Sequence, residues 1–584
     1  MSHVQGRERS MLTPSRRQFV KGLAAGGVVA AGGAIAPSVA FGRTQAPGPR
    51  QPHATLSGPD VDLTIGTSQV DFTGRSRPAL TVNGSLPAPL LEWREGDTVT
   101  VRVRNTLDED ASIHWHGLVL PANMDGVPGL SFDGIPAGGD FTYRFPLKQA
   151  GTYWYHSHSG FQEQQGLYGP LVIRPREADP IACDREHVLM LSDWTDDDPA
   201  RILRTLKKES DYYNWRQRTV VDLMRDVRQH GWADTIADRA AWGRMRMSAA
   251  DLADVTGSTY TYLLNGTAPA GNWTGLFRPG ERVRLRVING SAMTYFDVRI
   301  PGLEMTVVAA DGQPVRPVVV DEFRIAVAET YDVIVTPTGR EAFTVMAQAM
   351  DRTGYAAGTL AVREGVRAPV PALDPRPVLS MADMGHGHGQ GHGHGSGTGH
   401  GGPATAMQAH PASEDGNPLV DMQVMQPSSR LDDPGIGLRD NGRRVLTYAD
   451  LRSAFADPDG REPSRTIELH LTGHMNRFVW SFDGRKFSDA APIRLVYGER
   501  VRIVLVNDTM MTHPIHLHGM WSDVEDDEGR FMVRKHTVDM PPGSRRSYRV
   551  TADALGRWAY HCHMLFHMET GMMREVHVVE GDAS

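Results

Sequence analysis

Three stretches of the chain repeat one pattern of alternating apolar and polar positions. They occupy residues 95–105, 279–289 and 497–507, and each has a glycine near its start and an asparagine at its end. Side chains on a β-strand point alternately to opposite faces of the sheet, so a period of two predicts a half-buried strand. The repeat therefore predicts three equivalent β-strands.

The spacing of these copies indicates three related domains. The first and second copies are 184 residues apart and the second and third are 218 apart, which is the ordinary size of one domain. We expect an all-β protein with three β-sandwich domains, over residues 55–177, 178–366 and 443–580.

Two segments depart from the β pattern. Residues 199–254 place apolar side chains at helical spacing and end near Ser248 and Asp251, which are spaced like a capping box. They predict a helical insertion in the second domain. Residues 367–442 are rich in proline, glycine, histidine and methionine, which predicts a flexible linker.

Composition narrows the function. The chain has 584 residues, of which 40% are hydrophobic and 22% charged, so it should fold rather than remain disordered. A net charge of −8 without a basic stretch argues against nucleic acid or an anionic membrane as the main partner. Two cysteines, Cys183 and Cys562, exclude a disulfide-rich scaffold.

The first 40 residues resemble a twin-arginine export signal. Arg16 and Arg17 precede a mild apolar run over residues 22–36, and small residues at 38–40 form a cleavage site. The alternative is a short membrane anchor, but the run is too short to span a bilayer comfortably. We expect a mature protein that is soluble, does not bind a membrane and lies outside the cytoplasm.

Paired histidines are the strongest chemical signal. The chain has 24 histidines, which would form about one His-x-His pair by chance. Two pairs lie in the glycine-rich part of the linker and reflect its composition. Four others lie in the first and third domains, and on a strand each pair presents both imidazoles on one face. These pairs are His114 and His116, His156 and His158, His516 and His518, and His561 and His563.

The pairs occupy matched positions in the repeat. His114 follows Asn105 by nine residues and His516 follows Asn507 by nine, whereas the same offset from Asn289 gives Val298. The first and third domains thus supply two pairs each and the second supplies none. Eight imidazoles at an interface between the first and third domains suit a cluster of several copper ions.

A second site is predicted within the third domain. Cys562 lies between His561 and His563, so its side chain points to the opposite face of the strand. His513, His567 and Met572 complete a set of two imidazoles, one thiolate and one thioether, the ligands of blue-copper electron-transfer sites. The first domain has Ala111 and Ser157 at the matching places and cannot build this site.

These motifs resemble those of the three-domain multicopper oxidases over essentially the whole mature chain. The motifs are 114–117, 156–159, 513–519 and 561–572, and stretches 211–247 and 512–540 are similar to the periplasmic copper-resistance protein A family. The resemblance implies cupredoxin-like Greek-key β-sandwiches, with a helical insertion in the second. It also implies four coppers per chain: one type 1, one type 2 and two type 3.

The resemblance also implies a role for each ligand. Type 1 copper would be held by His513, Cys562 and His567 with Met572 axial, and type 2 copper by His114 and His516. One type 3 copper would use His116, His156 and His563, and the other His158, His518 and His561. Electrons would pass from Cys562 to His561 and His563 and reduce dioxygen to water.

Members of the family have an acidic residue at the position of Asp125, which makes Asp125 a candidate proton relay. The alternative is that Asp125 is only a turn residue within 124–128. The chain departs from some relatives after the second type 1 histidine. Those relatives have glutamate there, whereas this chain has Met568 followed by Glu569. The proton-donor role of that glutamate is therefore not assigned to Glu569.

The linker is a further candidate for copper binding. It contains His386, His388, His392, His394, His400 and His410, with Met381, Met384, Met407, Met422 and Met425 around them. Imidazole suits Cu(II) and thioether suits Cu(I). The alternative is a solvated spacer.

The sequence thus predicts a periplasmic multicopper oxidase of a Gram-negative bacterium that confers copper tolerance. Its expected substrates are Cu(I), with catechols or other phenols as a second class, and O2. Periplasmic copper chaperones are expected partners, and Cu(II) is the expected product. The rival interpretations are a laccase-like phenol oxidase and a non-catalytic copper carrier.

Overall fold

The computed structural model describes residues 54–214, 217–245, 247–384 and 407–581. The predicted export signal at residues 1–40 lies outside these ranges. All described elements belong to one compact unit. None of the helices in the described ranges is long and apolar enough to cross a membrane.

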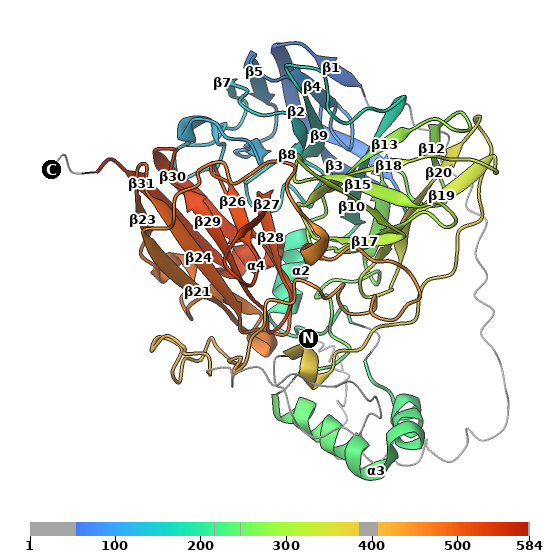
Figure 1. The fold of residues 1–584 in the computed structure, drawn as a ribbon, viewed down its shortest axis with the longest axis vertical. Helices are drawn as coiled ribbons and strands as arrows, with labels where there is room; N and C mark the ends of the chain where they lie inside the picture. The colour runs from blue at the N-terminus through green and yellow to red at the C-terminus, as the bar shows by residue number, and fades with distance from the viewer. Residues whose placement is uncertain (1–53, 215–216, 246, 385–406, 582–584) are drawn as a thin grey trace, which may run out of the picture. The chain divides into compact units, whose positions relative to one another are not determined.

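Three pairs of β-sheets follow one another along the chain, as the repeat predicts (Figure 1). The first sandwich has sheets ordered β1-β4-β9-β8-β6 and β3-β2-β5-β7. Its strands are β1 (Thr55–Ser57), β2 (Asp60–Asp71), β3 (Ser76–Val82), β4 (Leu90–Arg94), β5 (Thr98–Asn105), β6 (His114–His116), β7 (Asp140–Pro146), β8 (Gly151–His156) and β9 (Tyr168–Arg174). A short helical turn, η2 (Ala122–Met124), precedes Asp125.

The second sandwich has sheets ordered β11-β10-β13-β18-β15-β16 and β12-β20-β19-β14-β17. Its strands are β10 (Arg185–Thr195), β11 (Tyr260–Leu264), β12 (Trp273–Leu276), β13 (Val283–Asn289), β14 (Phe296–Arg299), β15 (Met305–Ala310), β16 (Gln313–Val320), β17 (Glu322–Ile325), β18 (Thr330–Val335), β19 (Ala342–Ala349) and β20 (Tyr355–Ala361).

The predicted helical insertion of the second sandwich is confirmed between β10 and β11. It contains α2 (Pro199–Leu206) and α3 (Val220–Met245), which is interrupted at Gly231 by a left-handed φ of 82°. The predicted capping box at Ser248 is wrong. Residues 247–257 form turns, in which the amide of Asp251 donates to the carbonyl of Ser248 at 2.9 Å.

The third sandwich has sheets ordered β22-β21-β24-β29-β26-β27 and β23-β31-β30-β25-β28. Its strands are β21 (Arg465–His474), β22 (Val479–Phe482), β23 (Ile493–Val496), β24 (Arg500–Asn507), β25 (His513–Leu517), β26 (Ser522–Glu525), β27 (Phe531–Lys535), β28 (Thr537–Met540), β29 (Arg545–Thr551), β30 (Gly556–Cys562) and β31 (Met573–Val579). The short helix α4 (Leu565–Thr570) follows β30, and the turns η3 (Met381–Met384), η4 (Tyr448–Asp450), η5 (Met475–Arg477) and η6 (Phe487–Asp489) lie in connections.

The repeated motif forms the same strand in each sandwich: β5, β13 and β24. Each of these strands pairs in parallel with the first long strand of its sandwich and antiparallel with a later one. The prediction that they are half-buried holds for β5 but is wrong for β13 and β24. In those strands Arg284, Arg286 and Arg500 are also buried, because each pairs with buried or half-buried carboxylates.

The described parts of the linker pack against the sandwiches, contrary to the flexible linker that composition predicts. Leu379, Met384, Met422 and Val424 are all buried in the core that the second and third sandwiches share. The amide of Leu379 donates to the carbonyl of Ala249 at 2.8 Å. A few apolar side chains are thus sufficient to fix residues that are otherwise polar and glycine-rich.

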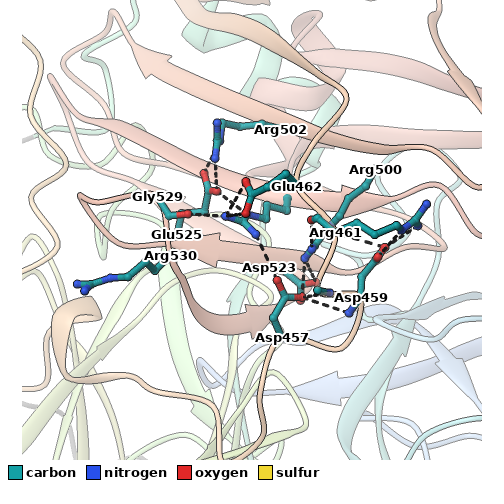
Figure 2. A network of polar contacts seen from close by, with 12 residues as sticks. Asp457, Asp459, Arg461, Glu462, Arg500, Arg502, Asp523, Glu525, Gly529 and Arg530 are labelled. Carbon is teal, nitrogen blue, oxygen red and sulfur yellow. Dashed lines mark hydrogen bonds and ion pairs between the residues drawn. The ribbon is translucent and has the colours of Figure 1, made fainter.

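A network of ion pairs joins strands β24, β26 and β29 of the third sandwich to one another and to Asp457, which precedes β21 (Figure 2). Glu525 receives hydrogen bonds from Arg502 at 2.7 Å and from Arg549 at 2.6 Å, and its side chain is fully buried. Arg500 donates to Asp457 at 2.6 Å from a side chain that is 1% exposed. Removing one partner from such a network leaves the other charge buried and unpaired.

Replacing Glu525 with glutamine is therefore expected to lower the free energy of unfolding of the third sandwich by about 3 kcal/mol. The measurement is the midpoint of its calorimetric transition. Glu528→Gln is the matched control, since that side chain is 65% exposed and pairs with an exposed Arg530, so its effect should stay within about 0.5 kcal/mol. Equal effects in the two variants would contradict the prediction.

The difference in free energy of unfolding between Glu525→Gln and the native chain should depend on pH. Burial raises the pKa of Glu525, but the hydrogen bonds from Arg502 and Arg549 outweigh it, so the pKa lies below its ordinary value of 4.5. A lowered folded-state pKa contributes stability above the unfolded-state pKa, and this stability is lost as pH falls through the folded-state value. The difference should be constant above pH 4.5 and narrow below it.

Candidate metal centres

The four histidine pairs of the first and third sandwiches converge in one cluster. In the first sandwich β6 pairs with the end of β8, which places His114 opposite His156. In the third, β25 pairs with β30, which places His516 opposite His561. His116 lies on the same face of β6 as His114. The other second histidines, His158, His518 and His563, follow the ends of β8, β25 and β30.

The two half-clusters face each other across the sandwiches. The rings of His114 and His518 stack with centroids 3.9 Å apart, and those of His116 and His516 with centroids 3.8 Å apart. Their nitrogen atoms form three groups, each within 4.8 Å. The groups are His114 with His116 and His516, His116 with His156 and His563, and His158 with His518 and His561.

Nε2 of His518 and Nε2 of His561 lie 3.1 Å from each other, but the other inward nitrogens of this cluster have no hydrogen-bond partner. They are buried, and they include Nε2 of His114, His156, His158 and His516, Nδ1 of His116, and both ring nitrogens of His563. Burial lowers the pKa of His561 to about 4 and the pKa values of His116, His156 and His516 well below the ordinary value. Neutral imidazoles with unpaired lone pairs that point at one another are the donor set that several copper ions need.

The outward nitrogens, in contrast, are held by acceptors. His114 donates from Nδ1 to the carbonyl of Asp125 at 2.8 Å, and His516 to the carbonyl of His536 at 2.6 Å. His561 donates to the carbonyl of Cys562 at 3.0 Å. A metal-binding histidine is ordinarily fixed in this way, because the outer hydrogen bond selects the tautomer.

Two buried carboxylates contact two further outward nitrogens of the cluster. The predicted residue Asp125 accepts from Nδ1 of His518 at 2.8 Å. Glu163, which the sequence did not single out, lies 2.6 Å from Nδ1 of His156. Burial, and to a lesser extent Asp193, raises the pKa of Glu163 well above its ordinary value. Glu569 lies on α4 and is exposed.

His536 is a further residue that sequence reasoning missed. It follows β27, and its Nδ1 lies 3.1 Å from Nε2 of His116. Its amide donates to Asp311 at 3.1 Å, which fixes the backbone whose carbonyl holds His516. No histidine pair or repeat marks this position, so the sequence contains no local signal for it.

The predicted second centre lies around Cys562 at the end of β30. The Sγ atom of Cys562 is 3.5 Å from Nδ1 of His513 and 3.7 Å from Nδ1 of His567, and these two nitrogens are 3.0 Å apart. Met572 is buried, and its carbonyl accepts from the amide of Cys562 at 3.1 Å. Burial raises the pKa of the Cys562 thiol, so its thiolate requires a bound cation, which fits a copper site.

The outer nitrogens of this centre also have partners. Nε2 of His513 meets the hydroxyl of Thr509 at 2.7 Å, and Nε2 of His567 meets Asp254 at 2.7 Å. Burial lowers the pKa of His567 to about 3 and raises that of Asp254 to about 7. Asp254 belongs to the second sandwich, so this sandwich supplies a positioning residue although it supplies none of the predicted ligands.

The asparagine that ends each repeat explains why ligand positions match. The side-chain amide of Asn105 donates to the carbonyls of Glu109 and Ile135, and that of Asn507 to the carbonyls of Met511 and Met540. Each fixes the loop that leads from the repeated strand to the first histidine. Asn289 does the same in the second sandwich, where the equivalent Val298 is buried in the core.

The structure describes only one of the six linker histidines that the sequence singled out. His386, His388, His392, His394 and His400 lie outside the described residues. His410 is described and lies among His470, Glu414 and Asp508.

Three family models, each described as a multicopper oxidase, match residues 64–178, 185–365 and 460–582. Among solved structures, Fet3p, a multicopper oxidase that functions in iron import, has a TM-score of 0.63 at 20% identity over 90% of both chains. The multi-copper oxidase of Pseudomonas thermotolerans has a TM-score of 0.57 at 23% identity over 90% of this chain and 100% of its own. These two likenesses show the shared fold.

Curated relatives are more similar in sequence. A copper resistance protein A homolog of Pseudomonas syringae pv. tomato is 65% identical over 97% of this chain and 99% of its own length. Copper resistance protein A of Escherichia coli is 61% identical over 98% of this chain and 100% of its own. The multicopper oxidase MmcO of Mycobacterium tuberculosis is 29% identical over 96% and 95%. The chain belongs to the multicopper oxidases and, within them, to the copper resistance protein A family.

Proposed function

We propose that this copper-resistance oxidase converts Cu(I) to Cu(II) and reduces dioxygen to water. Four Cu(I) ions, one O2 and four protons give four Cu(II) ions and two water molecules. The proposal places the enzyme in the periplasm of a Gram-negative bacterium, where a twin-arginine signal at residues 1–40 delivers it and copper chaperones supply metal. The names of its copper-resistance relatives support copper as the substrate.

The proposal assigns four coppers to the two centres. His513, Cys562 and His567 hold type 1 copper with Met572 axial, and His114 and His516 hold type 2 copper. The type 3 pair uses His116, His156 and His563 on one side and His158, His518 and His561 on the other. Three of the four groups of ligand atoms coincide with these sets, and the fourth adds His116 to the type 2 pair.

The position of Cys562 between the two centres is the observation that best supports the proposal. Its Sγ lies at the centre formed by His513 and His567, while the residues on both sides of it, His561 and His563, point into the eight-histidine cluster. Copper bound at both centres would supply one-electron oxidation of substrate at the first and reduction of dioxygen at the second. The backbone of β30 then joins the two centres through a few covalent bonds.

We propose that Asp125 transfers the protons that water formation requires. Its Oδ2 is 2.8 Å from Nδ1 of His518, and its Oδ1 is buried without a hydrogen-bond partner. A carboxylate in this position can hold a proton at Oδ1 while Oδ2 keeps its contact with the imidazole. Asp125 thus both orients a ligand and supplies a site for proton transfer.

The surroundings of His567 favour a small cationic reductant. Met568, the next residue on α4, is half-buried and not fully enclosed, and a thioether is a preferred ligand of Cu(I). Asp254 contacts Nε2 of His567 at 2.7 Å and so adds a carboxylate next to this ligand. Phenols remain the alternative reductants, and the experiment separates them.

The test is a comparison of oxygen uptake with Cu(I) and with a catechol, on purified protein of known copper content. About four coppers per chain in addition to linker copper, an intense blue band and a type 2 signal in the electron paramagnetic resonance spectrum are expected. Cu(I) should give the higher kcat/KM, with four Cu(I) oxidised for each O2 consumed.

Three outcomes would contradict parts of this proposal. A catechol that is turned over much faster than Cu(I) would favour a laccase-like phenol oxidase. Copper binding without a blue band, lost when residues 381–425 are deleted, would favour a non-catalytic carrier. A stoichiometry of two Cu(I) per O2 would show that hydrogen peroxide, and not water, is the product.

A further inference from the structure

A second cluster of imidazoles and carboxylates lies apart from the predicted copper ligands. His410 and Glu414 come from the end of the linker, His470 from β21, and Asp508 from the residue after β24. One ligand atom from each lies within 4.8 Å of those of the other three. Nδ1 of His470 is 2.6 Å from Asp508, and Nδ1 of His410 is 3.2 Å from Glu414.

The cluster is buried, and one of its oxygens has no donor. The side chains of Glu414 and Asp508 are fully buried, that of His470 is 1% exposed and that of His410 is 9% exposed. Oε1 of Glu414 receives no hydrogen bond, and Nδ1 of His470 lies 3.6 Å from it. A buried carboxylate oxygen without a donor is unfavourable unless a cation satisfies it.

Both imidazoles have the outer hydrogen bonds of metal-binding histidines. Nε2 of His410 meets the carbonyl of Val424 at 3.1 Å, and Nε2 of His470 meets Glu468 at 3.4 Å. In the structure, Nδ1–H of each ring donates to a carboxylate. A divalent ion that displaces these protons would receive the Nδ1 lone pairs, while Nε2 keeps its proton and its outer acceptor. This is the arrangement by which outer acceptors select the tautomer of a metal ligand.

We propose that His410, Glu414, His470 and Asp508 form a fifth metal site, which takes a divalent ion and prefers Cu(II). Two carboxylates and one divalent cation give a neutral buried group when both imidazoles are neutral. The donor set contains nitrogen and oxygen but no sulfur, which favours Cu(II) over Cu(I), and Cu(II) binds such sets more tightly than other first-row divalent ions.

The site connects the linker to the centre at Cys562. The amide of Val424 donates to Oδ1 of Asp508 at 2.7 Å, and the next residue, Thr509, contacts Nε2 of His513. A metal here would fix residues 410–424 against the third sandwich. Its ligand Asp508 is adjacent in sequence to Thr509, which contacts His513, a predicted copper ligand of the centre at Cys562. The choice of Cu(II) as the physiological ion rests on the proposed function; the site itself does not.

The test is equilibrium dialysis of the air-oxidised, copper-loaded full-length protein against buffered Cu(II). Native protein should retain one Cu(II) per chain more than His410→Gln or Glu414→Gln, or bind it at least about tenfold more tightly. The extra ion should give a tetragonal electron paramagnetic resonance signal with nitrogen splitting that both variants lose. His577→Gln, which removes a histidine of β31 outside the cluster, should match native protein.

The histidines at 386–400 are unchanged in every variant, so their copper cancels in the comparison. Equal Cu(II) retention in native protein and both variants, with the blue band intact, would overturn the site and leave an ion-paired cluster that joins linker and sandwich. If His410→Gln does not fold, the near-isosteric Glu414→Gln decides alone. Failure of the proposed function would appear as a missing blue band or missing Cu(I) oxidation, and neither measurement depends on the fifth ion.

Discussion

Replacing Cys562 with serine is expected to abolish the blue absorption of the copper-loaded protein and almost all of its oxidase activity. Cys562 provides the thiolate between His513 and His567, and a serine hydroxyl is a far weaker copper ligand. Loss of a residue that only hydrogen-bonds to a metal ligand lowers metal affinity or activity by about 10–100-fold. Loss of the ligand itself should therefore lower turnover by more than about 100-fold. The measurements are the optical spectrum and oxygen uptake.

The copper content of the Cys562→Ser variant separates a lost site from a misfolded chain. The eight-histidine cluster does not use the sulfur, so its copper and the type 2 signal should remain. Cys183→Ser is the matched control, since Cys183 is half-buried near Glu186 and outside both centres. A blue band in Cys562→Ser would refute the assignment of the thiolate.

Replacing Asp125 with alanine or asparagine should separate its two roles. Alanine removes the acceptor 2.8 Å from Nδ1 of His518, leaving a buried N–H unpaired, and should lower copper affinity by about 10–100-fold. Asparagine keeps an oxygen for that N–H but cannot exchange a proton. Asp125→Asn should therefore keep its copper while turnover falls by about 100-fold or more.

The readouts for Asp125 are copper content, kcat and the solvent isotope effect on kcat. A larger isotope effect in Asp125→Asn is expected if proton delivery becomes rate-limiting. Asp133→Asn is the control, because Asp133 lies in the same loop region and is exposed. If Asp125→Asn has native turnover, Asp125 only positions His518 and is not a proton relay.

The histidine pairs could be predicted from the residues because their spacing has a local geometric meaning, whereas their division among the coppers came from the family resemblance. Histidines two residues apart share one face of a strand, and equal offsets from Asn105 and Asn507 show that two sandwiches are matched. The structure brings these side chains together. Glu163, Asp254, Thr509 and His536 were missed because each acts through a contact between distant segments, and nothing near them in the sequence repeats.

Average composition was a poor guide to the linker. Its polar, glycine-rich character predicts flexibility, but Met384 and Val424 are fully buried and hold their neighbours in place. The burial of β13 was also missed, since Arg286 reads as a solvent-facing residue until its partners Asp332 and Glu186 are known. In both cases the deciding partner comes from another part of the chain.

The division of the eight-histidine cluster between the first and last sandwiches bears on the order of events during synthesis. Asp125 and its partner His518 are 393 residues apart, and His563 directly follows β30 of the third sandwich. A nascent chain that has completed only the first sandwich contains four of the eight cluster histidines, and the other four have not yet been synthesised. The full set of predicted copper ligands therefore first exists after the third sandwich has been synthesised, and no partly made chain that lacks this sandwich can hold the complete cluster.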